Sequence, residues 1–414
     1  MAPLVSVLLP TRDRLEFLRY ALETVLRQDD PDWEIVVSDN DSGEDIAGHL
    51  DGLADERIRY VRTPSFVPVT DNWNSALEHS AGRYVVMLGD DDGLMPGYVR
   101  RVRELLERYR EPELIYHGAW LYAYPGVDPA EASGYLQFYG YAEFMRGAAE
   151  PFLLDAATRR RMVEAAMRFR VRYGFNMQFS TVSRALVDRL APQGPFYQSA
   201  FPDYYATNVA FLTAREIVVE PRPLVAIGVT PKSYGFFHIN DREEAGKAFL
   251  EAPSGAAARP EQPVAEMPGS NINTGWLSAL EAIARRYPAL VPAQPARRRF
   301  RVLQALSVYE AHFLEGTANE AQLARMEAHL RPWERAIGRA AMHAARLGKR
   351  TLPGAVTRRF SAFFHHAGLR QYIGWYAPRL PGAYETLLDV FERPPADPPP
   401  APRPLPQRLR KTAV

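Results

Sequence analysis

The sequence contains no cysteine among its 414 residues. This absence excludes disulfides, thiolate zinc sites and thiol nucleophiles, and it fits the cytosol. The sequence also has no run of roughly 18 uninterrupted apolar residues, so no bilayer-spanning helix is expected. Residues 1–14 lack a basic n-region and a long apolar core, so we expect no secretory signal peptide.

Charge of both signs is present, but it is unevenly distributed along the chain. The net charge is +1, yet residues 1–240 hold 25 Lys and Arg against 33 Asp and Glu. Residues 331–380 hold 10 against 1. With 47% hydrophobic residues, the composition is that of an ordinary globular protein, and the length allows two domains. An acidic front half is therefore joined to one strongly basic segment.

Short apolar runs alternate with helical patterns in the first hundred residues. Apolar positions between Arg14 and Arg27 have helical spacing. Strands are predicted at residues 4–9, 33–37, 58–61 and 84–88. This alternation predicts an α/β fold with a mostly parallel sheet and flanking helices.

The later part of the chain is expected to change from mixed to helical structure. Residues 114–124 are predicted to form a strand pair, and residues 216–227 two short strands broken by Pro221 and Pro223. The pattern after residue 274 is helical and rich in Ala, Arg and Leu. The expected parts are an α/β domain (1–245), a linker (246–273), an all-helical domain (274–392) and a Pro-rich disordered tail (393–414).

The stretch Tyr84 to Gly97 combines a predicted buried strand with three successive carboxylates, Asp90, Asp91 and Asp92. Three acids at the end of a strand repel one another and resist loss of water. A hard divalent cation, shared with phosphate oxygens, relieves that repulsion. A solvated acidic turn is the alternative. The position at a strand end favours the cation, because open α/β sheets bind ligands there.

Three motifs in the first half carry a resemblance to a known family. They are VSVLLPTRDR (5–14), WEIVVSDNDS (33–42) and YVVMLGDDDGLMP (84–96), in that order. Together they make residues 1 to about 240 resemble the family 2 glycosyltransferases, which have the GT-A fold. The resemblance implies a nucleotide-diphosphate sugar, with a UDP-sugar favoured, bound across the carboxyl ends of the strands. It says nothing about the C-terminal third.

The resemblance implies nucleotide-binding roles at the first two motifs. Pro10, Thr11 and Arg12 match positions that hold the base and ribose, and Asp39 matches the acceptor for the base, commonly uracil N3–H. A carboxylate at a strand end can accept from an imide N–H. The structural alternatives are an Asx turn at Asp39 and a helix N-terminus with a surface arginine at Thr11 and Arg12.

The third motif matches the family's DxD position, which implies Mn²⁺ or Mg²⁺ as cofactor. Gly89 replaces an acid found in many members, so either Asp90 with Asp92, or Asp91 with one neighbour, is the metal-binding pair. Asp90 and Asp91 are also candidates for the nucleotide. His238 is a candidate third metal ligand or diphosphate contact, although a lone histidine is more often structural.

The family uses a carboxylate as catalytic base, and Asp203 matches it. Asp203 stands at a predicted helix start after a Gly- and Pro-containing loop. An inverting transfer needs one carboxylate to take the proton of the acceptor hydroxyl. Capping of the helix is the structural alternative. Asp188 is a competing candidate, but it lies within a helical pattern.

Two aromatic groups of residues have open roles. Tyr116, Trp120, Tyr122 and Tyr124 form either a sugar-stacking wall or a core stripe. The basic segment 331–380 interleaves arginines with aromatics, a composition typical of peripheral contact with the inner, anionic membrane face. Pairing with the acidic front half is the preferred explanation. No nucleic-acid motif is present, so no nucleic-acid partner is expected.

The sequence therefore predicts an inverting, metal-dependent glycosyltransferase in cell-surface glycan synthesis. Its acceptor is expected to be a saccharide or a lipid-linked molecule. A sugar nucleotidyltransferase would carry a Gly-rich phosphate loop after the first strand, and residues 7–14 have no glycine. A catalytically degenerate transferase that acts as a membrane- or partner-binding scaffold is the remaining alternative.

Overall fold

The computed structural model describes residues 2–128, 132–139, 142–233, 267–351, 379–380 and 382–396. The chain divides into two compact units. The first comprises Met1–Arg160, Tyr173–Arg259 and Gly374–Pro404. The second comprises Arg161–Arg172, Pro260–Ile373 and Leu405–Val414. His238 lies outside the described residues, as do residues 352–378.

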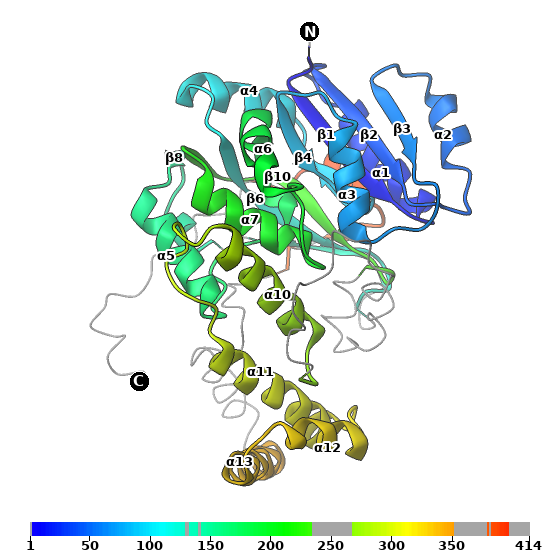
Figure 1. Cartoon of the computed structure of the whole chain (residues 1–414). Coiled ribbons are helices and arrows are strands. Elements are labelled where there is room, and N and C mark those ends of the chain that lie inside the picture. The colour runs from blue at the N-terminus through cyan, green and yellow to red at the C-terminus, as the bar shows by residue number, and fades with distance from the viewer. Residues whose placement is uncertain are drawn as a thin grey trace. The chain divides into compact units, whose positions relative to one another are not determined.

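Strands and helices alternate through the first half of the chain (Figure 1). The elements up to the third motif are β1 (Val5–Thr11), α1 (Leu15–Leu26), β2 (Trp33–Asp39), α2 (Ile46–Leu53), β3 (Ile58–Arg62), α3 (Val69–Glu78), β4 (Tyr84–Met87), β5 (Gly93–Leu94) and α4 (Tyr98–Tyr109). Those that follow are β6 (Leu114–Ala123), β7 (Tyr135–Phe138), η1 (Glu143–Met145), β8 (Phe152–Leu153), α5 (Ala156–Met167), η2 (Met177–Phe179), β9 (Ser180–Ser183), α6 (Arg184–Leu190), η3 (Ala191–Gln193), α7 (Pro202–Thr213) and β10 (Ile217–Val229).

The strands of the first unit form one mixed sheet. Its order is β3-β2-β1-β4-β9-β6-β10-β5, with β7 beside β6 and β8 beside β10. Strands β3, β2, β1 and β4 are parallel. β9 is antiparallel to both neighbours, whereas β10 runs parallel to β6. The expected α/β sheet with flanking helices is confirmed.

This topology brings the three sequence motifs to one edge of the sheet. Thr11 at the end of β1 is in register with Asp39 at the end of β2. β4 is parallel to β1, so the acidic turn that follows it lies at the same edge. The carboxyl end of β10 also reaches this edge, because β6 and β10 are parallel to β4 across the single antiparallel strand β9.

Two expectations about the later strands are wrong. Residues 114–123 form one strand, β6, rather than a pair. Residues 217–229 also form one strand, β10, in spite of Pro221 and Pro223. The pairing with β6 shifts register between Glu220 and Pro223 and again between Pro223 and Val225. Such irregularities let a strand accommodate residues that cannot donate to the ladder.

A segment near the C-terminus returns to the first unit. Isolated bridges pair Gly134 with Tyr384 and Gln137 with Arg379. The short helix α15 (Leu387–Glu392) buries Leu387 and Val390 in the same core as β6 and β7. The expected boundaries differ here, because residues 382–392 were assigned to the helical domain by their apolar pattern.

The described part of the second unit is helical. It contains α10 (Asn271–Arg286), α11 (Arg297–Glu310), a π-helical turn η5 (Ala311–Glu315), α12 (Glu320–Ala328) and α13 (Pro332–Thr351). α12 begins with a capping box in which Asn319 and Gln322 exchange hydrogen bonds. Among the described helices, none has both the length and the apolar character to cross a membrane.

Candidate active site

The acidic turn after β4 gives its three carboxylates different surroundings. Asp92 points into the protein, where Oδ2 accepts from the Gly89 N–H and from Gln178 Nε2, both at 2.7 Å. Its Oδ1 accepts from the Gly228 N–H at 2.7 Å. Burial raises the pKa of Asp92 to about 7, even though these donors favour the charged form. Asp92 was expected as a metal ligand, but here it joins η2 and β10 to the turn.

Asp90 and Asp91 share one arginine. Arg14 Nη1 lies 3.1 Å from Asp90 Oδ1, and Nη2 lies 2.7 Å from Asp91 Oδ2. Thr11 donates to the other oxygen of Asp90 at 2.8 Å, and Ser233 donates to Asp91 Oδ2 at 2.5 Å. Asp91 Oδ1 has no hydrogen-bond donor within the described residues, so it is the free oxygen of the pair.

The charges at this edge set the protonation of Asp90. Burial raises the pKa of Asp90 to about 6, while Arg14 opposes the shift and Asp91 adds to it. Burial by itself would lower the pKa of Arg14, but the carboxylates of Asp90 and Asp91 outweigh it and raise that pKa. The guanidinium therefore stays charged and offsets one of two neighbouring negative charges.

The remaining residues expected at the nucleotide lie beside this pair. Pro10 and Thr11 end β1, and Thr11 is buried against Asp90. Arg12 is half-exposed. Its guanidinium lies 4.2 Å from the centre of the Phe66 ring and donates to the Asn40 carbonyl. Pro10 and Thr11 are thus part of the end of strand β1, whereas the Arg12 guanidinium lies over the Phe66 ring at the surface.

Asp39 is fully buried, with 0% of its surface exposed. Its Oδ1 accepts from the Ser42 N–H at 2.9 Å, a bond to the residue three positions on rather than two as in an Asx turn. Its Oδ2 accepts from Tyr60 at 2.7 Å and from Arg62 at 3.0 Å. The carboxylate therefore holds the loop after β2 and would have to exchange one of these partners to meet a nucleotide base.

Asp203 lies in the first turn of α7 and carries a carboxylate without a cationic partner among the described residues. Its Oδ1 accepts from the Tyr204 N–H at 2.7 Å. The residue before the helix, Phe201, makes no side-chain cap. Burial raises the pKa of Asp203 to about 7. A carboxylate that is half-protonated near neutral pH suits proton transfer. Asp188, the competing candidate, is exposed on α6.

The loop before Asp203 is held by α3. Asn74 donates to the Tyr197 carbonyl at 2.9 Å and accepts from the Tyr197 N–H at 3.1 Å. Thr70 donates to the Ser199 carbonyl at 2.6 Å. On its other side, α7 meets the segment before β9, where Thr207 donates to the Phe175 carbonyl at 2.7 Å. The same segment carries Gln178, the partner of Asp92, so these bonds connect α7 with the acidic turn.

The aromatic residues of β6, and Tyr124 just after it, belong to the core. Tyr116, Trp120, Tyr122 and Tyr124 are all buried. The Tyr122 and Tyr124 rings lie 4.4 Å apart, and Tyr124 donates to the Asp91 carbonyl at 3.2 Å. The structure therefore supports the core stripe, not an open sugar-stacking wall. Lys232 pairs with Glu16 at 2.8 Å.

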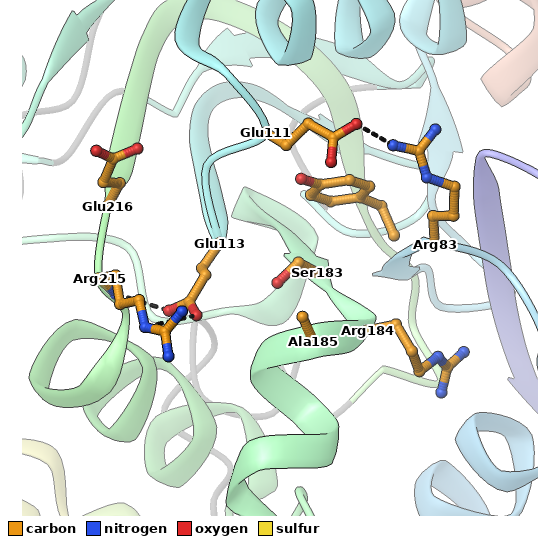
Figure 2. Close-up of a pocket in the computed structure, with 9 residues that line it drawn as sticks. Arg83, Glu111, Glu113, Ser183, Arg184, Ala185, Arg215 and Glu216 are labelled. Atoms are coloured by element: carbon orange, nitrogen blue, oxygen red, sulfur yellow. Dashed lines mark hydrogen bonds and ion pairs between the residues drawn. The ribbon is translucent and has the colours of Figure 1, made fainter.

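A cavity of about 450 Å³ lies at the opposite edge of the sheet (Figure 2). Its lining includes Tyr84, where β4 begins, and Glu113 and Glu216, which precede β6 and β10. Figure 2 shows Arg83 paired with Glu111 and Arg215 facing Glu113. Ligands of open α/β sheets bind at the carboxyl ends of the strands. The cavity is therefore not the candidate active site.

Sequence reasoning missed three residues that shape the acidic turn: Arg14, Gln178 and Ser233. Arg14 is part of the first motif, so its position beside the strand end was a usable signal. Gln178 and Ser233 contact the turn across separations of 86 and 142 residues, and nothing in their local sequence indicates it.

The donor atoms at this edge fit a hard divalent cation only in part. Across the described ranges, no three His, Asp or Glu side chains converge to form a protein-only metal site. Mg²⁺ is commonly held by one or two carboxylates together with substrate phosphates and water. Asp90 and Asp91 can supply those two carboxylates if Arg14 gives up part of its contact. The set therefore fits a cation that is shared with a diphosphate.

Asp92→Ala is expected to lower the free energy of unfolding by roughly 3 kcal/mol without any ligand, because three buried donors lose their acceptor. The exposed Asp188→Ala should change it by less than about 0.5 kcal/mol. Urea unfolding of the two variants measures the difference. A loss that appears only with Mn²⁺ and a nucleotide would instead make Asp92 a ligand.

Gly228→Ala should disturb the site by a steric route. A Cβ at this position would lie 1.8 Å from the Asp91 carbonyl oxygen, so β10 or the acidic turn must move. We expect a loss of about 3 kcal/mol in the free energy of unfolding. Gly52→Ala is the control, because nothing lies within 4 Å of its Cβ and it lies in α2. That change should be neutral or stabilising by up to about 1 kcal/mol.

Comparison with known proteins supports the family resemblance that the three sequence motifs carry. Residues 6–138 match the family model "Glycosyl transferase family 2". A Campylobacter jejuni GalNAc(5)-diNAcBac-PP-undecaprenol beta-1,3-glucosyltransferase is 35% identical over 23% of this chain and 32% of its own length. The putative colanic acid biosynthesis glycosyl transferase WcaA of Escherichia coli is 31% identical over 29% and 42%, respectively.

The chain matches less than half the length of each of these relatives. The matched regions span about a third to two fifths of these relatives' lengths. A solved structure of S. aureus TarS 1-349 with UDP-GlcNAc aligns with 79% of this chain and 91% of its own at 14% identity, with a TM-score of 0.45. Residues 6–138, which carry β1, β2, β4 and the acidic turn, are the part of the chain that matches the glycosyl transferase family 2 model.

Proposed function

We propose that this protein is an inverting glycosyltransferase. It transfers a sugar from a nucleotide-diphosphate sugar to a saccharide or a lipid-linked acceptor. The observation that carries the proposal is the combination of two kinds of carboxylate in one unit. Asp90 and Asp91 lie paired at the carboxyl edge of the sheet, and Asp203, which has no cationic partner in the part of the chain that the structure describes, has a pKa of about 7.

The donor is proposed to bind along the edge formed by β1, β2 and the acidic turn. Pro10, Thr11 and Arg12 lie on the nucleotide side, and Asp39 would accept from the base after releasing Arg62 or Tyr60. UDP is the favoured nucleotide, because one relative is named as a UDP-Glc:alpha-D-GlcNAc-diphosphoundecaprenol beta-1,3-glucosyltransferase. That name and the name of the Campylobacter relative also favour a lipid-linked acceptor.

The proposed cofactor is Mn²⁺ or Mg²⁺, which neutralises the departing diphosphate when bound. Asp91 and Asp90 would hold it, with Asp91 Oδ1 as the accessible oxygen. Arg14, already at this edge, places a second positive charge next to the leaving group. Asp92 keeps the turn in position through Gly89, Gln178 and Gly228. His238 is retained only as a prediction from the sequence.

Asp203 is proposed to take the proton of the acceptor hydroxyl as its oxygen attacks the anomeric carbon. The bond to the diphosphate breaks on the opposite face of the sugar, so the configuration inverts. The hydrogen bonds from Asn74 and Thr70 to the preceding loop hold the start of α7. Because no cation pairs with Asp203 among the described residues, the carboxylate is not held in its charged form before the acceptor arrives.

A thermal-shift panel of nucleoside diphosphates and UDP-sugars, with and without Mn²⁺, tests the proposal. We expect UDP with Mn²⁺ to raise the melting temperature, and one UDP-sugar to be turned over. Stabilisation without transfer to any saccharide or lipid-linked acceptor would favour the alternative, a degenerate transferase that acts as a scaffold. No response to any nucleotide would overturn both the donor site and the enzyme assignment.

A further inference from the structure

Helix α13 packs against the rest of the second unit through one face. Gly338 on this face lies against Tyr309, because a Cβ there would be 2.4 Å from the tyrosine ring. Met342, one turn later, is buried. Arg339 donates to both carboxylate oxygens of Glu327, at 2.6 and 2.7 Å. The inner side of the helix is therefore accounted for by contacts within the unit.

The outer side of α13 presents large apolar side chains to solvent. Trp333 is 57% exposed, Ile337 61% and Leu347 63%. Together with Ala340 and Ala344, they follow one another at spacings of four and three, which places them on one helix face. Three of the seven large exposed apolar residues in the described chain thus fall on a single face of one helix.

Positive charge accompanies this face. Residues 331–351 contain six Lys and Arg against one Glu. Arg346 is exposed and lies seven residues after Arg339, so it projects from the same flank of the helix, where Arg339 is already paired with Glu327. An apolar stripe with tryptophan, flanked by arginines, is the arrangement of helices that lie in the interface of a membrane.

We infer that the outer face of α13 binds the surface of an anionic phospholipid bilayer. Trp333 and Ile337 would enter the headgroup region, and Arg346 would meet the lipid phosphates. A second copy of the chain is a poor occupant, because a symmetric contact would bring two strongly basic helices together. Nucleic acid is also a poor occupant, because the exposed stripe between the arginines is apolar.

This inference deepens the proposed function, since a lipid-linked acceptor resides in a membrane. Helix α13 would hold the protein at that surface, whereas the sheet edge of the first unit would bind the donor. The proposed function and this inference can fail separately. Nucleotide stabilisation reports on the acidic turn, and vesicle binding reports on α13.

Vesicle flotation of the full chain tests the inference. We expect binding to phosphatidylcholine vesicles that contain phosphatidylglycerol, little binding to phosphatidylcholine alone, and weaker binding at high salt. The double variant Trp333→Ser/Ile337→Ser should lower the partition coefficient by roughly tenfold or more. Val302→Ser/Leu290→Ser is the matched control, because both residues are exposed in the same unit but lie outside α13.

Charge and position are tested by two further variants. Arg346→Glu should lower the partition coefficient at least about fivefold, whereas Arg325→Glu, exposed on α12, should change it little. Trp333→Phe should keep binding but lose the blue shift of tryptophan fluorescence on adding vesicles. Equal binding of the serine pair and wild type would overturn the inference. Dimerisation that Trp333→Ser abolishes would also overturn it, because the occupant of the face would then be a second copy. DNA binding that Arg346→Glu abolishes and the serine pair leaves unchanged would overturn it as well.

Discussion

Asp203→Asn is expected to lower the rate of sugar transfer by about a hundredfold to ten-thousandfold. The amide cannot accept the proton of the acceptor hydroxyl, and the geometry of α7 changes little because asparagine keeps an oxygen for the Tyr204 N–H. The kcat with a UDP-sugar and the acceptor measures this loss. The melting-temperature shift on UDP binding, measured on the same sample, should remain as in wild type.

The pH dependence provides a second measurement on Asp203. Its pKa is about 7 because burial disfavours the charged form. The base is active when deprotonated, so kcat should rise with pH through about 7 and then level off. The contribution of Asp203 to the free energy of unfolding changes with pH in the opposite direction to kcat. The unfolded pKa is near 4, so stabilisation by the protonated carboxyl is complete below that value and is lost as pH rises toward 7. Asp203→Asn should therefore gain melting temperature relative to wild type between pH 5 and pH 8.

Asp188→Asn is the matched control for this change. It removes an equivalent carboxylate that is exposed on α6, with the same loss of one negative charge. We expect full transfer activity and an unchanged pH profile. Transfer retained by Asp203→Asn but lost in Asp188→Asn would exchange the two residues' roles. Transfer retained in both would remove the general base from the mechanism.

The sequence predicted that the three motifs would meet at one edge of the sheet, because strand ends are a local signal. Apolar runs ending at Leu9, Val37 and Leu88 were enough to expect the polar residues that follow them at one edge, and the register of β1 with β2 and β4 places them there. The orientation of each carboxylate was not predictable. Asp92 turns inward because its donors include Gly228, which is 136 residues away.

Domain boundaries failed for a related reason. Leu387 and Val390 have the spacing of a helix face, so the pattern grouped them with the helices that precede them. Which core such a face covers depends on partners distant in sequence. In the structure, this face belongs to the same buried cluster as Trp120 and Tyr122 of β6. Periodicity therefore identified the helix but not the unit to which it belongs.

Arg14→Gln is expected to cost about 3 kcal/mol of the free energy of unfolding at pH 8, since it removes the cation between two buried carboxylates. The loss should shrink at pH 5. The pKa of Asp90 is about 6 with Arg14 present, and without that cation it rises further. At pH 5 the variant therefore protonates Asp90 and removes the repulsion. Urea unfolding at the two pH values measures the difference.

Arg27→Gln is the control, because Arg27 pairs with Glu23 and Glu392 at the surface and its removal should cost less than about 1 kcal/mol at either pH. The same pair of variants tests whether Arg14 and a divalent cation meet the same carboxylates. Mn²⁺ should raise the melting temperature of Arg14→Gln more than that of wild type, because it replaces the missing positive charge. Stabilisation by Mn²⁺ that is lost with Arg14 would mean instead that the guanidinium and the cation bind side by side.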